Sequence, residues 1–465
     1  MSAIFFNIKK TKNMKYLLII LLVLQTFFLH AQESTFILGK TINYAPNKIA
    51  AKYLYDNFTS HRAYIEVDVN EMGEFKAELI INSPTLVRLQ SKNLSIEVYV
   101  EPMKDVGVFF DANDVNNSIQ FFEKDGLKNN EHLKQFNTML YENTKLKDMS
   151  FDDRLKYINE VRHSKISKLK QIESNSSLSA EYKNYLNIKT KYQEHTELLG
   201  WIDIDSISTD NRATFRAQYT HEIINNIEAL NHPAYIDFLD KFTIFYCEQT
   251  LNKSLNYNED SQTIYTCLQD SKELVEEVKD YMLGRLFYFN LTPSNLNKIQ
   301  KCYDDFINTS NSPHLIDKVK KQYKKVQKFA GGTAPAFELE GKDGKKINLK
   351  DFEGKKVYLS FWASWCGPCK HEIRGARENR AILKDDDIVF IYVSLDEQKD
   401  KWLKHKVTNE ESGTHLWGQG MKSKIRNDYA IASLPATFLI DEAGNFVNDF
   451  PKSDTPEFID FIKKM

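Results

Sequence analysis

The sequence predicts a multidomain protein with a small N-terminal β-sandwich, a central α-helical region and a C-terminal α/β domain. Three observations support this. Short alternating apolar runs broken by Pro, Gly and Asn occupy residues 32–115, and amphipathic stripes at helical spacing occupy residues 116–328. An apolar strand pattern, a Cys-x-x-Cys pair and a helix pattern follow one another within residues 336–465. A chain of 465 residues is long enough for two to three such domains.

Residues 1–31 have the pattern of a secretory signal peptide. A lysine-rich stretch, 9–15, precedes an almost unbroken apolar run, 16–29, and Ala31 offers a small residue at the cleavage point. The apolar run is shorter than the ~20 residues that a membrane-spanning helix needs. We therefore expect an exported, periplasmic protein that is soluble after cleavage, with a membrane tether by an uncleaved segment as the alternative.

Residues 32–115 are predicted to form the β-sandwich, because short strands at regular spacing with turn signals are typical of that architecture. The stretch Asn70–Gly73 is one such turn signal. No catalytic constellation occurs in this region. The expected strands are Phe36–Lys40, Ile49–Leu54, Ala63–Val69, Glu74–Ile80, Thr85–Gln90, Ile96–Val100 and Val106–Phe110.

Residues 116–328 are predicted to be helical, because apolar side chains recur there at helical spacing and glycine is almost absent. Such stripes form cores far more often than ligand sites, so we expect a role in spacing, dimerisation or partner recognition. A linker, 329–335, follows and contains the flexible Gly331-Gly332 pair. The stripes are Leu133/Phe136/Leu140, Leu155/Ile158/Val161, Ile223/Ile224/Ile227/Leu230 and Tyr235/Phe238/Leu239.

The C-terminal domain, 336–465, alternates strand and helix signals. Runs that are apolar on both faces suit buried parallel strands, and turn residues mark two hairpins. The last helix opens at Thr455-Pro456, since proline is tolerated in a first helical turn. The other expected elements are strands at Val357–Trp362 and Ile388–Val393, hairpins around Lys342–Gly344 and Asp441–Gly444, and helices at Cys369–Leu383 and Asp400–Val407.

The Trp365-Cys366-Gly367-Pro368-Cys369 stretch carries the chemistry. It joins a strand to a helix, so Cys366 is expected at a helix N-terminus, where free N–H groups and the macrodipole lower a thiol pKa. The thiolate is the attacking species in disulfide exchange, and Cys369, one turn further in, is placed to resolve the mixed disulfide. The spacing therefore predicts a dithiol–disulfide centre at an exposed, reactive position.

Two alternatives were weighed for this pair. A zinc site needs about four ligands, and the remaining cysteines, Cys247, Cys267 and Cys302, are isolated and far upstream, so no metal is expected. A purely structural disulfide is disfavoured by Pro368 and Trp365, which suit a reactive site. Cys267 and Cys302 could pair, and the sequence does not decide this. A net charge of −2 without a basic stripe argues against a nucleic-acid partner.

Two segments carry a family resemblance: FWASWCGPCKHEI, residues 361–373, and SLPATFLIDEAGNFV, residues 433–447. Together they resemble the exported TlpA/ResA-like thiol–disulfide oxidoreductases, which have a thioredoxin fold. The resemblance implies that Pro435 has a cis peptide bond and faces the redox disulfide, with Leu434 before it. It also implies that Trp365, Leu434 and Pro435 shape the surface where the substrate backbone docks.

Glu372 is the acid that the sequence places closest to the pair. Thioredoxin carries a buried acid six residues before the first cysteine, but Ser360 stands at that position here. Glu372 lies three residues after Cys369, on the same helix face. The resemblance implies that it tunes the thiols and accepts a proton. The alternative is an ordinary solvated glutamate beside Lys370 and Arg374.

The expected function is that of an exported thiol–disulfide oxidoreductase that reduces disulfides in other exported proteins, with no cofactor. The Gly-Pro dipeptide between the cysteines resembles that of the reducing members. Because the compartment is oxidising, the family implies a membrane thiol-reducing partner of the DsbD/CcdA kind. Two alternatives stay open: a disulfide isomerase or oxidase, for which the upstream region could supply a homo-oligomer, and a binding protein with an accessory redox domain.

Overall fold

The computed structural model describes residues 34–44, 48–91, 94–136, 149–150, 169–200, 215–257, 260–292, 295–329, 332–383 and 388–465, with single positions between 153 and 167. The predicted signal peptide, Gly331 and the stripe Leu155/Ile158/Val161 lie outside the described residues. The chain divides into two compact units. The first runs to Asn187 without residues 57–59, and the second contains residues 57–59 and 188–465.

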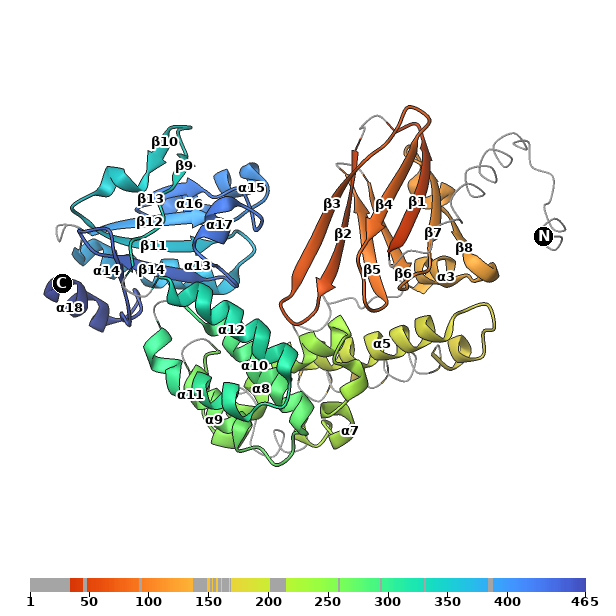
Figure 1. Ribbon diagram of the computed structural model, residues 1–465, viewed down its shortest axis with the longest axis horizontal. Helices are drawn as coiled ribbons and strands as arrows, with labels where there is room; N and C mark the ends of the chain where they lie inside the picture. Colours follow the sequence, from red (N-terminus) through yellow and green to blue (C-terminus); the bar gives the residue numbers. More distant parts are fainter. Residues whose placement is uncertain are drawn as a thin grey trace. The chain divides into compact units, whose positions relative to one another are not determined.

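The first unit contains two four-stranded sheets that share one apolar core (Figure 1). Their orders are β4-β1-β7-β8 and β3-β2-β5-β6; β1 and β7 are parallel and the other pairs antiparallel. Side chains alternate inward along β4, where Phe75, Ala77 and Leu79 are buried. The strands are β1 Thr35–Ile42, β2 Lys48–Asp56, β3 His61–Asp68, β4 Glu74–Leu79, β5 Thr85–Gln90, β6 Ser95–Val100, β7 Val106–Asp111 and β8 Gln120–Glu123.

Strand β8 was not expected from the sequence. Its four residues include two neighbouring phenylalanines and show no alternation, and none of them is fully buried. Antiparallel pairing with β7 holds it at the edge of the sheet. Helical segments around it are α2 Val115–Ser118, η1 Lys124–Gly126 and α3 Asn129–Phe136.

The second unit begins with helices that pack on one another through apolar faces. Helix α8 starts where His232 accepts a hydrogen bond from the Ala234 N–H, with Pro233 in its first turn, and ends at Asn252 in the left-handed region. Helix α10 is buried along most of its length, against α8, α9, α11 and α12. The helices are α5 Ala180–Gly200, which begins in the first unit, α7 His221–Ile224, η5 Ile227–Ala229, α8 Pro233–Leu251, α9 Ser261–Gln269, α10 Glu276–Asn290, α11 Leu296–Thr309 and α12 Pro313–Gln327.

Residues 57–59 belong to this second unit although they lie between β2 and β3. Phe58 is buried, and its ring packs edge-on against Tyr281. The guanidinium of buried Arg285 donates to the Phe58 carbonyl. A Cβ on Gly284 would come within 3.2 Å of the Phe58 ring, so the missing side chain of that glycine makes room for the phenylalanine.

The C-terminal domain is built on a seven-stranded sheet in the order β10-β9-β13-β12-β11-β14-β15 (Figure 1). Strand β11 is parallel to β12 and antiparallel to β14. Leu359 and Phe361 enter the core on one face of β11, while Tyr358 and Trp362 enter the core on the other. The strands are β9 Glu338–Gly341, β10 Lys346–Asn348, β11 Lys356–Trp362, β12 Ile388–Ser394, β13 Thr414–Trp417, β14 Ala436–Ile440 and β15 Phe446–Val447.

Helices cover the sheet, and two of the expected helices are each divided. The expected helix at Cys369–Leu383 breaks at Ala376, and the one at Asp400–Val407 breaks before His405, whose ring caps the second piece by accepting from the Val407 N–H. Strand β13 was also not expected, because it is only four residues long. The helical segments are η6 Leu349–Phe352, α13 Gly367–Gly375, α14 Arg377–Ile382, α15 Lys399–Leu403, α16 Lys406–Glu410, α17 Lys424–Asp428 and α18 Pro456–Lys464.

Within the part of the chain that the structure describes, no helix is both long and apolar enough to cross a membrane.

Candidate active site

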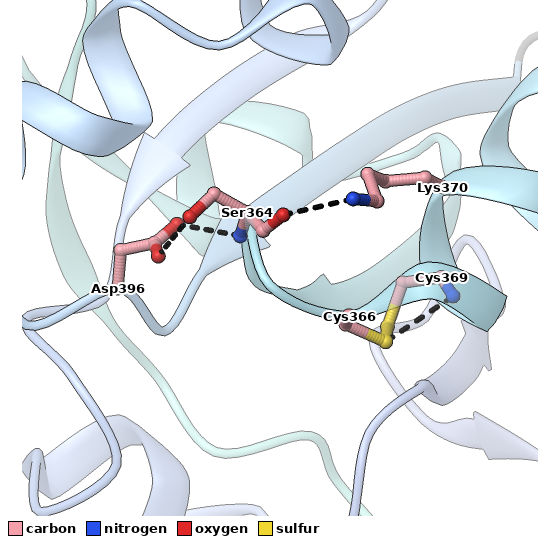
Figure 2. The surroundings of a disulfide bond; sticks show 5 residues. All are labelled: Ser364, Cys366, Cys369, Lys370 and Asp396. Carbon is pink, nitrogen blue, oxygen red and sulfur yellow. Dashed lines mark hydrogen bonds between the residues drawn. A yellow bond between two sulfur atoms is a disulfide. The ribbon is translucent and has the colours of Figure 1, made fainter. Parts of the chain in front are cut away.

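The two cysteines of the motif form a disulfide at the start of α13 (Figure 2). Cys366 is the N-cap residue, and its sulfur accepts a hydrogen bond from the Cys369 N–H at 3.2 Å. Pro368 lies in the first helical turn, where its missing N–H has no hydrogen-bonding consequence. Cys366 is thus at the helix end where N–H groups and the macrodipole stabilise a thiolate once the disulfide is reduced.

The disulfide is less exposed than the sequence suggests. Cys366 is 4% exposed and Cys369 1% exposed, whereas Trp365 is 61% exposed and Pro368 is also at the surface. Both cysteines belong to the apolar core between α13 and the sheet, and Leu434 packs against that core. The expectation of an exposed centre therefore holds for the surrounding loop and is wrong for the oxidised sulfurs, which turn inward onto apolar side chains.

A buried aspartate just after strand β12 shapes the loop before the disulfide. Asp396, 1% exposed, follows β12, and its carboxylate accepts hydrogen bonds from the Ser364 N–H at 2.9 Å and the Ser364 hydroxyl at 2.7 Å (Figure 2). The Ser394 hydroxyl donates to it as well, at 2.8 Å. These three donors compensate the buried charge and fix the turn that leads into Cys366.

Asp396 was not expected from the sequence, although the sequence contains a signal for it. Strands β11 and β12 are parallel, so their carboxyl ends meet at one edge of the sheet. Ser364 and Asp396 each follow one of those ends. From the other side of the loop, Lys370 donates to the Ser364 carbonyl at 3.0 Å (Figure 2), and the Trp417 indole donates to the Asp396 carbonyl at 2.9 Å. The Ser364 loop is therefore held by both Asp396 and Lys370, and Trp417 in turn fixes the backbone at Asp396.

Glu372 lies on α13, three residues after Cys369, and is half-buried. Its carboxylate accepts a hydrogen bond from the Tyr358 hydroxyl at 2.7 Å. The pKa of Glu372 is raised to about 7, mainly by burial; the Tyr358 hydrogen bond partly offsets this rise and the nearby charge of Asp454 adds to it. The alternative of an ordinary solvated glutamate therefore does not describe this side chain. Ser360, at the position of the thioredoxin acid, is buried in β11.

A buried ion pair anchors the far end of α13. Arg380 donates to the Ile373 carbonyl near the end of that helix at 2.5 Å and pairs with Glu411 at 2.6 Å. Burial alone would raise the pKa of Glu411, but the hydrogen bond from Arg377 and the charge of Arg380 outweigh it, so the pKa is lowered. Both ends of the redox helix are therefore tied to neighbouring elements.

The second motif segment forms the loop before β14. The Leu434–Pro435 peptide bond is cis, as the resemblance implies. Leu434 packs against the apolar core that contains both cysteines. The Ser433 hydroxyl donates to the carbonyl of Phe289 on α10 at 3.0 Å. The loop therefore contacts the disulfide core on one side and the helical part of the same unit on the other.

The three upstream cysteines are free thiols, and Cys267 does not pair with Cys302. Cys247 and Cys267 are buried and Cys302 is half-buried. The hydrogen bond with Cys267 and burial raise the pKa of the Cys247 thiol, which keeps it protonated. Among the described residues, no cluster of His, Cys, Asp and Glu side chains is arranged to hold a metal ion.

Comparisons with known proteins place this site in a family. Residues 330–448 match the AhpC/TSA family. Thiol–disulfide oxidoreductase ResA of Bacillus anthracis is 34% identical over 136 residues, which cover 29% of this chain and 78% of that protein. ResA of Bacillus thuringiensis subsp. konkukian is 32% identical over 144 residues, with the same coverage. The chain belongs to the ResA family of thiol–disulfide oxidoreductases.

The ResA relationship concerns the C-terminal domain, which has the expected thioredoxin-like fold. A solved structure of a thiol–disulfide oxidoreductase from Bacteroides fragilis is 25% identical, over 25% of this chain and 87% of that one, with a TM-score of 0.24. Residues 330–448, the stretch that matches the AhpC/TSA family, contain Cys366, Cys369, Glu372 and Pro435. The chain is accordingly a thiol–disulfide oxidoreductase, as the motif predicts.

Proposed function

We propose that this protein is an exported reductase of disulfides in other exported proteins, and that Cys366 and Cys369 are its redox pair. The observation that supports this most directly is the Cys366–Cys369 disulfide at the N-terminus of α13. In the reduced protein, the Cys366 thiolate attacks one sulfur of the substrate disulfide, which forms a mixed disulfide and releases one substrate thiolate. The Cys369 thiolate then attacks the Cys366 sulfur and releases the second substrate thiol. Two electrons pass from the enzyme dithiol to the substrate.

The neighbouring residues have distinct proposed roles. Exposed Trp365 and the Leu434-Pro435 segment form the surface on which the substrate backbone docks beside the disulfide. Glu372 accepts the Cys369 proton during resolution; burial holds its pKa at about 7, in the range that suits a general base at neutral pH. Asp396 is a positioning residue, because it acts through the Ser364 loop.

The proposed compartment is the periplasm, supported by the signal-peptide pattern of residues 1–31. A reductase in an oxidising compartment must be re-reduced after each turnover. We infer that a membrane thiol-reducing protein of the DsbD/CcdA kind supplies the electrons by disulfide exchange with Cys366. No cofactor is needed, because the cysteines themselves carry the two electrons.

The test uses the pre-reduced full chain and insulin in a single turnover, without dithiothreitol. Cys366→Ser should show no reaction, since it lacks the attacking thiolate. Cys369→Ser should attack and then stall as a mixed disulfide with insulin, visible on a non-reducing gel. Normal release of reduced insulin by the Cys369→Ser protein would show that the role of Cys369 is wrong.

The reduction potential decides the direction of the reaction. A potential near that of thioredoxin, about −270 mV, would support the reductase, whereas one near that of DsbA, about −120 mV, would identify an oxidase. Equilibration of the full chain with glutathione buffers provides the measurement. An intermediate potential together with a homo-oligomer would favour the isomerase.

A further inference from the structure

A cavity of about 460 Å³ lies beside the redox helix and has walls from two parts of the second unit. One wall comes from the thioredoxin-like domain and includes Pro368, Glu372 and Pro435. The other wall comes from the helical region: from the N-terminal turn of α9, the last residue of α10, the start of α11 and the described residues next to these two helices. Its residues include Gln262, Asn290, Thr292, Asn295 and Lys298. The region of the chain that the ResA relatives do not match thus borders the proposed active site.

Hydrogen bonds hold the two walls together. The Ser433 hydroxyl, two residues before Pro435, donates to the Phe289 carbonyl at 3.0 Å. The Asn297 amide on α11 donates to the Asp449 carboxylate at 2.5 Å. Because one of these contacts involves the loop that carries Pro435, the helical wall is fixed relative to the place where substrate is proposed to dock.

Two side-chain hydrogen bonds join the described residues between α10 and α11. The side-chain oxygen of Asn295 accepts a hydrogen bond from the Thr292 N–H at 3.0 Å, and its side-chain amide donates to the backbone carbonyl of Asn290 at 2.6 Å. These two bonds fix Thr292 and Asn295, which line the cavity, relative to the end of α10.

Asn290 supplies an observation that points to a ligand. Its side chain is 2% exposed, and its amide N–H donates to the Leu286 carbonyl at 2.9 Å. Its carbonyl oxygen Oδ1 is buried and has no hydrogen-bond donor among the described residues. A buried acceptor without a donor is costly, so a ligand N–H that reaches this oxygen through a small shift of the Asn290 side chain would stabilise it.

The charges around the cavity narrow the chemistry of that ligand. Lys298 lines the cavity on the helical wall and Lys452 on the thioredoxin-like wall, and the carboxyl groups of Glu372 and Asp454 also line it. Both signs are present, so neither a strongly anionic nor a strongly cationic small molecule is favoured. Amide, hydroxyl and apolar side chains fill the remaining surface, a mixture that suits a polypeptide segment with its alternating N–H and C=O groups.

We propose that the helical region forms the second wall of the substrate groove and binds the polypeptide segment that flanks the target disulfide. This rests on the proposed disulfide reductase activity and names its substrate class: a folded or unfolded protein whose chain extends beyond the cystine. A small disulfide without peptide groups reaches the redox pair without using this wall. The helical region thereby selects substrates for the thioredoxin-like domain.

The experiment compares two disulfides in single-turnover reactions of the pre-reduced full chain. Insulin presents peptide on both sides of its disulfides, and bis(2-hydroxyethyl) disulfide presents none. Thr292→Phe places a bulky ring in the cavity and should slow the insulin reaction about tenfold by steric exclusion. Asn290→Leu removes the free acceptor and should slow it about fivefold. Both variants should react with the small disulfide at a rate within twofold of wild type.

Asn308→Phe is the matched control, because Asn308 is exposed on α11 and lies outside the cavity. It should react with both disulfides like wild type. Insulin rates for Thr292→Phe and Asn290→Leu equal to those of this control would overturn the proposal, as would equal slowing with both disulfides. A wild-type chain that reduces neither compound would instead refute the proposed reductase activity.

Recognition is separated from chemistry by a binding measurement. Fluorescein-labelled insulin B chain with S-methylated cysteines is titrated with the oxidised full chain, and anisotropy reports the dissociation constant. Asn290→Leu and Thr292→Phe should each weaken binding by about fivefold or more relative to Asn308→Phe. Equal affinities in all three variants would refute the helical wall even if the redox activity failed.

Discussion

Two carboxyl groups near the redox motif differ in what surrounds them: Glu372 lies on the redox helix, and Asp396 is bonded to the loop before it. Asp396 is almost completely buried and accepts hydrogen bonds from three donors on Ser364 and Ser394. Glu372 is half-buried and is bonded to the Tyr358 hydroxyl, with the charge of Asp454 nearby. The pKa of Glu372 is raised to about 7 by burial. The two carboxyl groups therefore differ in how fully hydrogen-bond donors compensate their removal from water.

Removal of the Asp396 carboxylate should produce the largest effect. Asp396→Ala leaves the Ser364 N–H and two hydroxyl groups in a buried site without their acceptor, at an expected cost of about 3–4 kcal/mol in the free energy of unfolding. Urea unfolding followed by tryptophan fluorescence measures this in the relevant domain, because four of the five tryptophans, at 362, 365, 402 and 417, lie there.

Asp400→Ala is the matched control for that experiment. Asp400 is 83% exposed on α15, and its ion pair with Lys404 is solvent-exposed, so its loss should change stability by less than about 0.5 kcal/mol. Equal unfolding midpoints for the two alanine variants would contradict the structural role of Asp396.

The Glu372→Gln variant should have a smaller, pH-dependent effect. Its pKa is raised in the folded protein, so between about pH 4.5 and pH 7 the unfolded chain loses a proton that the folded chain retains. Wild-type stability should therefore fall as pH rises through this window, by at most about 3 kcal/mol, and be flat above it. Glutamine cannot ionise, so the variant should lack this decline.

The same unfolding assay at a series of pH values compares wild type with Glu372→Gln. Parallel stability curves from pH 4 to pH 8 would mean that Glu372 ionises as it does in water and that the contrast with Asp396 is absent. A wild-type curve that instead rises through this window would give the opposite sign for the pKa shift.

Loss of the Tyr358 hydroxyl should give the smallest change. Its hydrogen bond lowers the pKa of Glu372, so Tyr358→Phe should raise that pKa, by up to about one unit or ~1.4 kcal/mol. Carbon-13 NMR titration of the glutamate side-chain carboxyls, with Glu372→Gln to assign the resonance, provides the measurement. An unchanged or lower pKa in Tyr358→Phe would show that the hydroxyl does not stabilise the carboxylate.

The parts of the fold that the sequence predicts well have strong local signals. The apolar run at β11 and the Cys-x-x-Cys motif each define their element within a few residues. Strands β8 and β13 were missed because each has four residues, too few for a period to be recognised. Their existence depends on pairing with a neighbour that is distant in the sequence.

The candidate site shows the same limit. Glu372 was found because it lies one helical turn from Cys369, whereas Asp396 was missed because its partner Ser364 is 32 residues away. The proposed contribution of Asn290 to substrate binding could not be predicted, since it depends on how α10 packs against the cis-proline loop through Ser433. Sequence patterns report neighbours along a helix or strand, and contacts between elements need the tertiary structure.

Phe58 has a consequence for how this protein can be divided or recombined. The second unit contains residues 57–59, so its apolar interior is completed by a segment encoded far upstream of its helices. A gene fragment that starts at residue 188 would leave a hole beside Tyr281 and an arginine, Arg285, without a carbonyl that it binds. The boundary between the two units is therefore not a single point in the sequence. A fusion protein that contains the whole second unit should include residues 57–59 as well as 188–465.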